Sequence, residues 1–252
     1  MPMRFPTLNF DDGLIEVGRF HKAPVTLHPT FFLAAFVLTF HFWRVPGGMG
    51  PFLVILGILV LLGSILLHEF AHAEVGRRYG VTARRIDINL FGGLVHFATS
   101  PRRMQHDFAI TIAGPLTNAG LALSALLILA LVRLVSPDQF AISTAYGHVP
   151  PAGIIVQLAR FTCYLNAALA IANMLPAFPL DGGRLLYMLV AKRSGAHTAT
   201  LVVAALGTVF GAIASVVLLV STMAGIPIWS PPSLTANWNA LQQARSGHAV
   251  RI

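Results

Sequence analysis

The sequence predicts an all-α protein, a multi-pass transmembrane helical bundle with a small β-hairpin or sheet between its second and third spans. Of its 252 residues, 56% are hydrophobic and 10% are charged, and the mean hydropathy is +0.73. A soluble domain carries about 25% charged residues. Segments long and apolar enough to suggest spans lie at residues 30–43, 51–76, 108–135, 153–175 and 199–223. The expected solvent is therefore a lipid bilayer.

Composition divides the chain into three parts. Residues 1–28 are mixed and polar and form a cytoplasmic N-terminal segment, and no cleavable signal peptide is expected because no apolar core begins before about Thr30. Residues 29–228 form the membrane-embedded domain. Residues 229–252 form a polar C-terminal tail, expected to be loosely ordered. The first span is short, and "IPIWSPPSLTANW" is too short and polar to span alone, so we expect five or six spans.

Basic residues predict the orientation of the bundle. The stretch 77–103 carries six arginines against one acid, Asp87, whereas residues 134–151 carry no Lys or Arg. Cytoplasmic loops are enriched in Lys and Arg, so 77–103 and the N-terminus are placed in the cytoplasm. The net charge of +8 does not indicate nucleic acid, because the basic residues come in pairs beside apolar runs.

The second span ends in "LLHEFAHAEV", which contains an HExxH pattern. His68 and His72 project from one helix face on successive turns, as two ligands of a tetrahedral zinc would. Glu69 could then act as general base on a water held by the metal. The alternative is a pair of polar histidines that face a neighbouring helix. Inside a membrane span, ionisable groups are costly and usually functional, which favours the metal.

A catalytic zinc needs a third protein ligand, and the chain has only nine acids. No Glu follows Glu74, whose spacing is poor and whose better explanation is an ion pair with a following arginine. Asp87 and Asp107 lie in or beside the basic stretch, and Asp138 lies on the far side of the membrane. Asp181 remains, in "NMLPAFPLDGGR", at the same bilayer level as the histidines. An ordinary helix exit with a capping Asp is the alternative for this motif.

Three motifs in order, "HEFAH", "AGPLTN" and "NMLPAFPLDGGR", resemble the site-2 protease family of intramembrane zinc metalloproteases. The similarity runs from about His28 to Phe210. The chain looks like a minimal member, without an inserted PDZ-like domain between the motifs or a C-terminal regulatory domain. Gly114 and Pro115 of the middle motif are expected to allow close helix packing or a bend.

The resemblance implies a site and a reaction. It implies one Zn²⁺ per chain bound by His68, His72 and Asp181, with Glu69 activating water. Asn173 would lie beside the metal and orient the substrate or stabilise the oxyanion. The reaction would be hydrolysis of a peptide bond within or near a substrate's transmembrane helix, in regulated intramembrane proteolysis.

The same resemblance suggests partners and a location. The substrate would be a single-span membrane protein, such as an anti-sigma factor or other signalling protein, first trimmed by an upstream site-1 protease. The protein would lie in the cell (inner) membrane among lipids and bind no nucleic acid. The segment "RIDINLFGGLVHF" alternates around a Gly-Gly pair and predicts a hairpin, so Phe91, Gly92, Gly93 and Leu94 could bind an unwound substrate as an added strand. A hairpin that merely caps the cavity is the alternative.

Two rival functions could use the same residues. A zinc transporter could use the same ligands, but it should show ligands on both sides of the midplane, and the later spans offer almost none in their outer half beyond Arg160. A catalytically inactive, chaperone-like relative is disfavoured because all four core residues are present.

Overall fold

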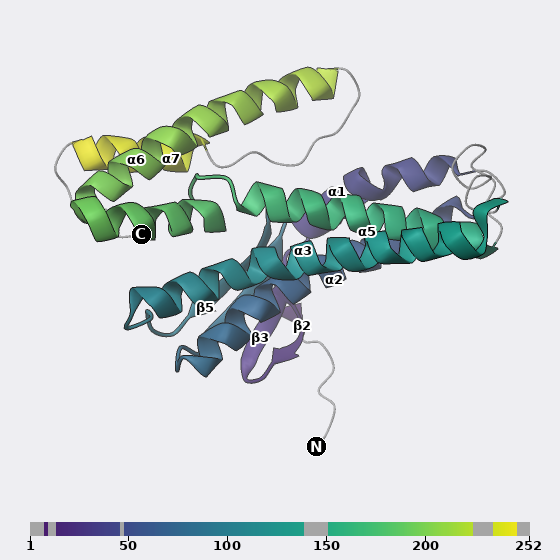
Figure 1. Ribbon diagram of the computed structural model, residues 1–252, viewed down its shortest axis with the longest axis horizontal. Helices are drawn as coiled ribbons and strands as arrows, with labels where there is room; N and C mark the ends of the chain where they lie inside the picture. Colours follow the sequence, from purple (N-terminus) through teal and green to yellow (C-terminus); the bar gives the residue numbers. More distant parts are fainter. Residues whose placement is uncertain (1–7, 10–13, 46–47, 139–150, 224–233, 246–252) are drawn as a thin grey trace.

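Four helices in the described part of the chain are long and apolar enough to cross a membrane. The computed structural model describes residues 8–9, 14–45, 48–138, 151–223 and 234–245. The four helices are α2 (Gly50–Arg78), α3 (Met104–Val135), α5 (Pro151–Asn173) and α6 (Asp181–Met223). Figure 1 shows α2, α3 and α5 running alongside one another. The helical bundle is confirmed, but the predicted count of five or six spans exceeds the four found in these residues.

The difference in count arises at residues 30–43, which were predicted to span. They form a ten-residue helix, α1 (Thr30–Thr39), followed by a 3-10 turn, η1 (Phe40–Arg44). At about 1.5 Å per residue, α1 is roughly 15 Å long, about half of the hydrocarbon core. Phe31 and Ala35 are buried in the protein core. Part of the apolar character of this segment therefore serves packing within the protein.

Helix α6 is broken at Gly195, where φ is 82° and ψ is 164°. Glycine adopts a left-handed φ of this kind at a lower conformational energy than other residues, so the chain can change direction there. Figure 1 shows the sharp turn between the two parts of α6. The first part carries Asp181, and the second contains the predicted span 199–223 up to the described end of the helix.

A five-stranded sheet lies beside the helices, in the order β1-β2-β3-β4-β5. The strands are β1 (Leu8–Asn9), β2 (Leu14–Phe20), β3 (Ala23–Leu27), β4 (Ala83–Asn89) and β5 (Gly92–Phe97). The predicted hairpin is confirmed as β4 and β5, which pair antiparallel. The pairing of β3 with β4 is parallel and joins Val25 to Ile86, and a contact so distant in sequence leaves no local pattern. The division of the chain at residues 28 and 228 stays a prediction, although residues 14–27 supply two strands to this sheet.

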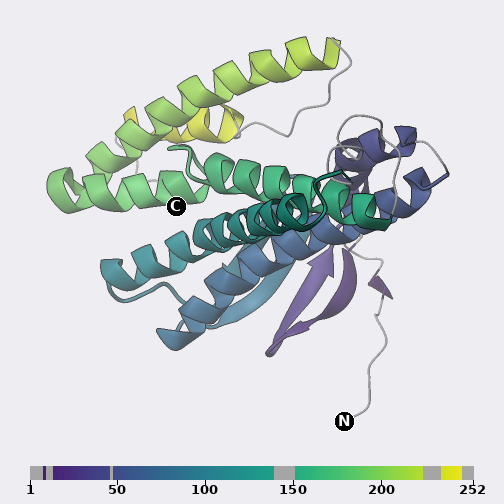
Figure 2. The same cartoon turned by 45° about the vertical axis from the view of Figure 1, so that its right-hand side comes forward.

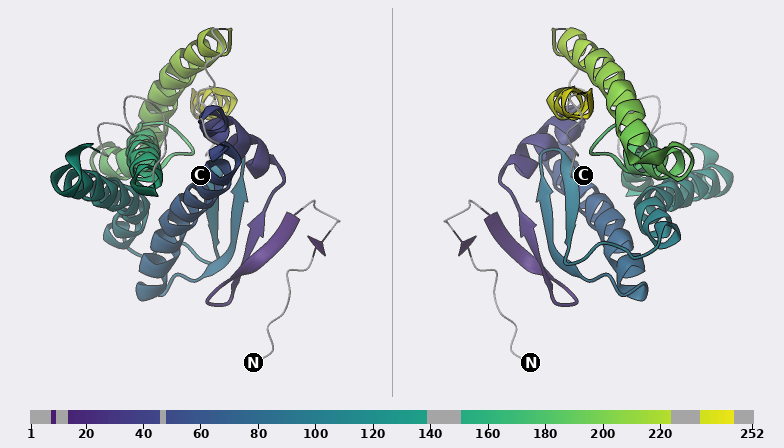
Figure 3. Two further views of the ribbon diagram at one scale, coloured as in Figure 1. Left: turned by 90° about the vertical axis from the view of Figure 1, so that its right-hand side faces the viewer. Right: turned by 90° about the vertical axis from the view of Figure 1, so that its left-hand side faces the viewer.

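Helix α2 lies between the sheet and helices α3 and α5, as Figures 2 and 3 show. Ile86 and Ile88 of β4 are fully buried in one cluster with Leu61 and Ile65 of α2. On the lipid side, α3 exposes large apolar side chains at Leu116, Leu123, Leu127 and Leu131. An apolar outer surface of this kind is stable in hydrocarbon.

The predicted loose tail is wrong for the residues that form α7 (Leu234–Arg245). Asn237, Leu241 and Ala244 are buried, at a spacing that gives one helix face. This face packs on α6, beside which Figure 1 shows α7. Packing of this stripe orders a segment whose average composition is polar.

Candidate metal centre

His68 and His72 lie on one face of α2, and both side chains are buried. Their Nε2 atoms are 3.1 Å apart, and their rings are nearly perpendicular at 80°. The spacing of four residues places them on successive turns. The two ring nitrogens therefore converge on one point, as the HExxH pattern predicts.

A carboxylate reaches the same point from the start of α6. The Oδ2 atom of Asp181 lies 3.2 Å from Nε2 of His68 and 3.4 Å from Nε2 of His72. The preceding loop folds tightly against the helix start, because a Cβ at Gly182 would lie 2.2 Å from the carbonyl oxygen of Met174. Glycine at this position allows the approach that brings Asp181 to the histidines.

The three converging atoms have the spacing of ligands on one zinc ion. The edges of the triangle measure 3.1, 3.2 and 3.4 Å. Two ligands at about 2.0–2.1 Å from a tetrahedral zinc are about 3.4 Å apart. The Oδ2 atom of Asp181 is buried without a hydrogen-bond partner, which is costly unless a cation meets it. These side chains fit zinc and leave the fourth coordination position to another group.

Helix α3 fixes the orientation of the second histidine and gives both rings room. Nδ1 of His72 donates to the carbonyl oxygen of Ile110, 2.7 Å away, so Nε2 faces Asp181. A Cβ at Gly114 would lie 2.3 Å from Nε2 of His72 and 2.5 Å from Nε2 of His68. The predicted close packing at Gly114 is thus a contact with the histidines themselves. The sequence could not single out Ile110, because every residue carries a carbonyl.

Glu69 is buried against strand β5. A Cβ at Gly93 would lie 2.3 Å from Cγ of Glu69 and 2.5 Å from its Oε1 atom. Gly92 begins the strand with φ +126°. Phe91 and Leu94 are 69% and 50% exposed. Of the four predicted hairpin residues, Gly93 therefore contacts the site, while Phe91 and Leu94 are open to the surroundings.

Asn173 ends α5 and is half-buried. Within the described residues, no hydrogen bond or ion pair joins it to His68, His72 or Asp181. Its role beside the metal stays a prediction.

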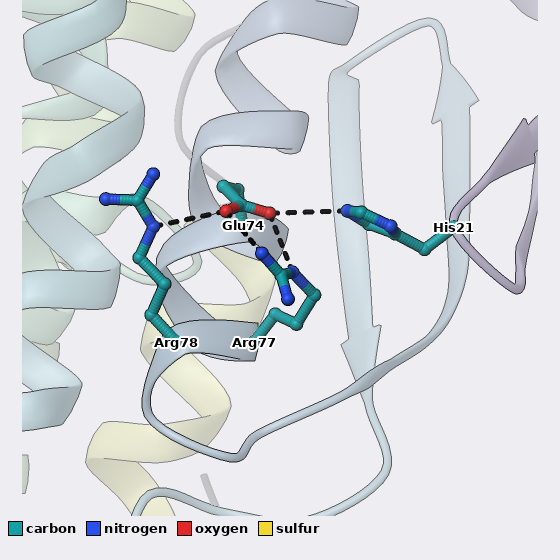
Figure 4. Close-up of polar contacts among 4 residues, drawn as sticks. All are labelled: His21, Glu74, Arg77 and Arg78. Atoms are coloured by element: carbon teal, nitrogen blue, oxygen red, sulfur yellow. Dashed lines mark hydrogen bonds and ion pairs between the residues drawn. The ribbon is translucent and has the colours of Figure 1, made fainter.

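Glu74 is not part of the group formed by His68, His72 and Asp181. It pairs with basic side chains, as Figure 4 shows. Its Oε1 atom is 2.8 Å from Nη2 of Arg77 and 3.1 Å from Nε of Arg78. Its Oε2 atom is 3.3 Å from Nε2 of His21 at the β2–β3 turn. The prediction that Glu74 is a charge partner is confirmed. Asp107 likewise pairs with a basic side chain, since its Oδ1 atom lies 2.6 Å from Nη2 of Arg184.

A model of peptidase family M50 matches residues 56–218. The chain belongs to peptidase family M50. The matched range contains all three motifs, so the predicted resemblance to site-2 proteases is confirmed. Between HEFAH and LDGG, the described residues form one hairpin and two helices, without an inserted PDZ domain. Family membership and the apolar helices make this a multi-pass membrane protein.

Two curated relatives are similar over much of the chain. A putative zinc metalloprotease of Synechocystis is 28% identical over 245 residues, which is 94% of this chain and 60% of that protein. The putative zinc metalloprotease Rip3 of Mycobacterium tuberculosis is 31% identical over 189 residues, 72% of this chain and 44% of that protein. The chain thus spans about half of these relatives' lengths. Membership of family M50 implies a zinc cofactor, which the His68–His72–Asp181 group could hold.

The same fold occurs in a solved structure, the site-2 protease from Methanocaldococcus jannaschii. The TM-score is 0.57 at 22% identity, covering 95% of this chain and 97% of that one. The likeness extends beyond the residues that the family model matches, so the shared architecture includes most of the chain.

Proposed function

We propose that this chain is an intramembrane zinc metalloendopeptidase that hydrolyses a peptide bond within or near the transmembrane helix of a membrane protein. The proposal rests on one observation: the Nε2 atoms of His68 and His72 and the Oδ2 atom of Asp181 lie at the distances expected between ligands of one zinc ion. The buried side chain of Glu69 comes from the same helix as the two histidines. Membership of a peptidase family agrees with this chemistry.

The proposed mechanism gives each side chain one task. Bound zinc supplies a Lewis acid that polarises the scissile carbonyl and acidifies water. His68, His72 and Asp181 hold it, and the Ile110 carbonyl keeps the ring of His72 in the required tautomer. Glu69 accepts the proton of the attacking water and returns it to the leaving amine.

Two further tasks belong to groups around these side chains. The amide of Asn173 steadies the substrate carbonyl or its oxyanion in this proposal. The helices exclude bulk water from the buried histidines and Glu69, so the charges that develop during hydrolysis meet fixed protein groups.

Removing the carboxylate of Asp181 tests the metal site directly. In Asp181→Ala we expect zinc content to fall from roughly one ion per chain to near zero, because two histidines alone make a weak site. The measurement is elemental analysis of protein purified in detergent. Asp87→Ala is a matched control, since the Asp87 side chain is 15% exposed and that of Asp181 is 17%. Full zinc occupancy in Asp181→Ala would contradict the ligand assignment.

We propose that the substrate binds by adding a strand to β5. Strand β5 is an edge of the sheet, and Gly93 brings that edge against Glu69. A substrate helix must unwind for its peptide bond to be attacked, and its freed backbone groups then need partners. The open edge of β5 supplies such partners next to the general base.

Cross-linking distinguishes strand addition from a hairpin that only caps the cavity. A photoreactive residue at Leu94 should cross-link to a transmembrane substrate in a Glu69→Gln background, which prevents turnover. The same residue at Val17 should not, although Val17 is an exposed apolar residue of the same sheet. Equal cross-linking at both positions, or none at Leu94, would argue for the capping role.

The substrate is, in this proposal, a single-span membrane protein such as an anti-sigma factor, cut first by a site-1 protease. The enzyme lies in the inner membrane with its N-terminus and metal centre on the cytoplasmic side. The six arginines of residues 77–103 support this orientation.

A zinc transporter is the less favoured alternative. A transport path needs successive sites, whereas the described residues contain a single candidate metal group, His68, His72 and Asp181. Glu69 beside that group is also better explained by hydrolysis than by transport.

A further inference from the structure

Asn237 of α7 is a fully buried polar residue that holds the backbone of a distant loop. Its Oδ1 atom accepts a hydrogen bond from the backbone N–H of Phe178 at 3.0 Å. Its Nδ2 atom donates to the carbonyl oxygen of the same residue at 2.6 Å. A side-chain amide that uses both ends on one peptide segment fixes that segment in position and in orientation.

The segment held in this way leads directly into the metal centre. Phe178 stands three residues before Asp181, in the loop that joins α5 to α6. Backbone hydrogen bonds at this loop are local, such as those from Leu180 N to Ala177 O and from Arg184 N to Leu180 O. The clamp from Asn237 therefore ties this loop to an element far away in sequence.

Helix α6 is shaped to admit the amide of Asn237. A Cβ at Gly207 would lie 1.9 Å from Oδ1 and 2.4 Å from Cγ of Asn237. Any side chain at position 207 would therefore displace the amide. The amide is enclosed by α6 on one side and by the loop on the other, so α7, α6 and the loop meet at one polar contact.

We propose that Asn237 is a positioning residue for the metal centre, which sets the place of the Asp181 carboxylate through the backbone of Phe178. The inference rests on the proposed zinc site. Metal ligands must be placed to within about 0.2 Å, and partners that orient ligands typically change metal affinity by 10- to 100-fold when removed. In this proposal α7 contributes to zinc binding through the hydrogen bonds of Asn237 to the backbone of Phe178.

The test compares zinc affinity with stability in the full chain purified in detergent. For Asn237→Ala we expect a zinc dissociation constant raised by roughly 10- to 100-fold, measured by competition with a chelator. We also expect kcat to fall more than KM rises. Leu241→Ala removes buried packing from the same helix, so it should lower Tm with little change in zinc affinity. Asn239→Ala, at an exposed position of α7, should match the wild type.

Two further variants test the same proposal if Asn237→Ala folds poorly. Asn237→Asp keeps the shape of the side chain and one acceptor, but loses the donor to the Phe178 carbonyl, so it should also weaken zinc binding. Gly207→Ala displaces the amide from the far side and should do the same. Gly120→Ala, where a Cβ meets open space, is its control.

The outcomes separate this inference from the proposed function. Wild-type protein that binds no zinc would refute the metal site itself. Wild-type protein that binds zinc, with Asn237→Ala and Leu241→Ala shifting zinc affinity equally for equal loss of Tm, would overturn the positioning role. A selective loss of zinc affinity in Asn237→Ala, Asn237→Asp and Gly207→Ala supports it.

Discussion

Replacing Glu69 with glutamine is expected to lower kcat for peptide-bond hydrolysis by roughly 10²- to 10⁴-fold while zinc stays bound. Glutamine has nearly the shape of glutamate, so it fits the buried space against Gly93. Its amide cannot accept the proton of the attacking water. The three proposed ligands are unchanged, so zinc content should equal that of the wild type. The measurements are cleavage of a single-span substrate in detergent or liposomes, and elemental analysis.

The same helix offers a matched control. Glu74→Gln makes an identical chemical change two residues beyond His72, where the carboxylate pairs with Arg77 and Arg78. It should cleave at nearly the wild-type rate, because exposed ion pairs contribute little. A Glu69→Gln enzyme with wild-type kcat would remove Glu69 from the mechanism. Loss of zinc in that variant would instead indicate a damaged site.

Gly114→Ala is expected to abolish both zinc binding and cleavage, although it adds a single methyl group. The new Cβ would lie 2.3 Å and 2.5 Å from the Nε2 atoms of His72 and His68. Carbon and nitrogen atoms that are not bonded stay more than about 3 Å apart, so either the rings turn away or α3 moves off α2. Both responses break the triangle of ligands. Zinc content and cleavage rate measure the effect.

Gly120→Ala is the control for this substitution, because it lies in the same helix with nothing within 4 Å of the added Cβ. Alanine is a better helix former than glycine by about 1 kcal/mol, so this variant should be as stable as the wild type or more so. If Gly114→Ala bound zinc as tightly as Gly120→Ala, the packing of α3 against the histidines would differ from that described.

Much of the candidate site could be predicted because its signals are local. His68 and His72 share a helix face by spacing alone, and the scarcity of acids leaves Asp181 as the remaining ligand. Hydropathy located the four long helices for the same reason, since each carries its own apolar run. The span predicted at residues 30–43 stays a prediction, because the segment forms a shorter apolar helix in which Phe31 and Ala35 are buried in protein while Phe32 and Leu33 are exposed.

The rest depends on contacts between segments that are far apart in sequence. The parallel pairing of β3 with β4 joins residues about 60 positions apart. Asn237 is a polar residue in a polar stretch, and only the packing of α7 on α6 reveals that it is buried. Its partner is the backbone of Phe178, and the sequence does not single out one backbone group from another.

The sequence by itself determined which chemistry is available: two histidines and a glutamate at helical spacing, and one suitable aspartate beyond two prolines. Only the tertiary structure decided that these groups meet, since His72 and Asp181 belong to different helices. It also decided that Gly114 makes room for the rings, and that β5 lies against Glu69. The physical reason is that side-chain identity and helix periodicity are local properties of the sequence. A metal site instead depends on the distances between ligand atoms on different elements, and the packing of those elements sets these distances.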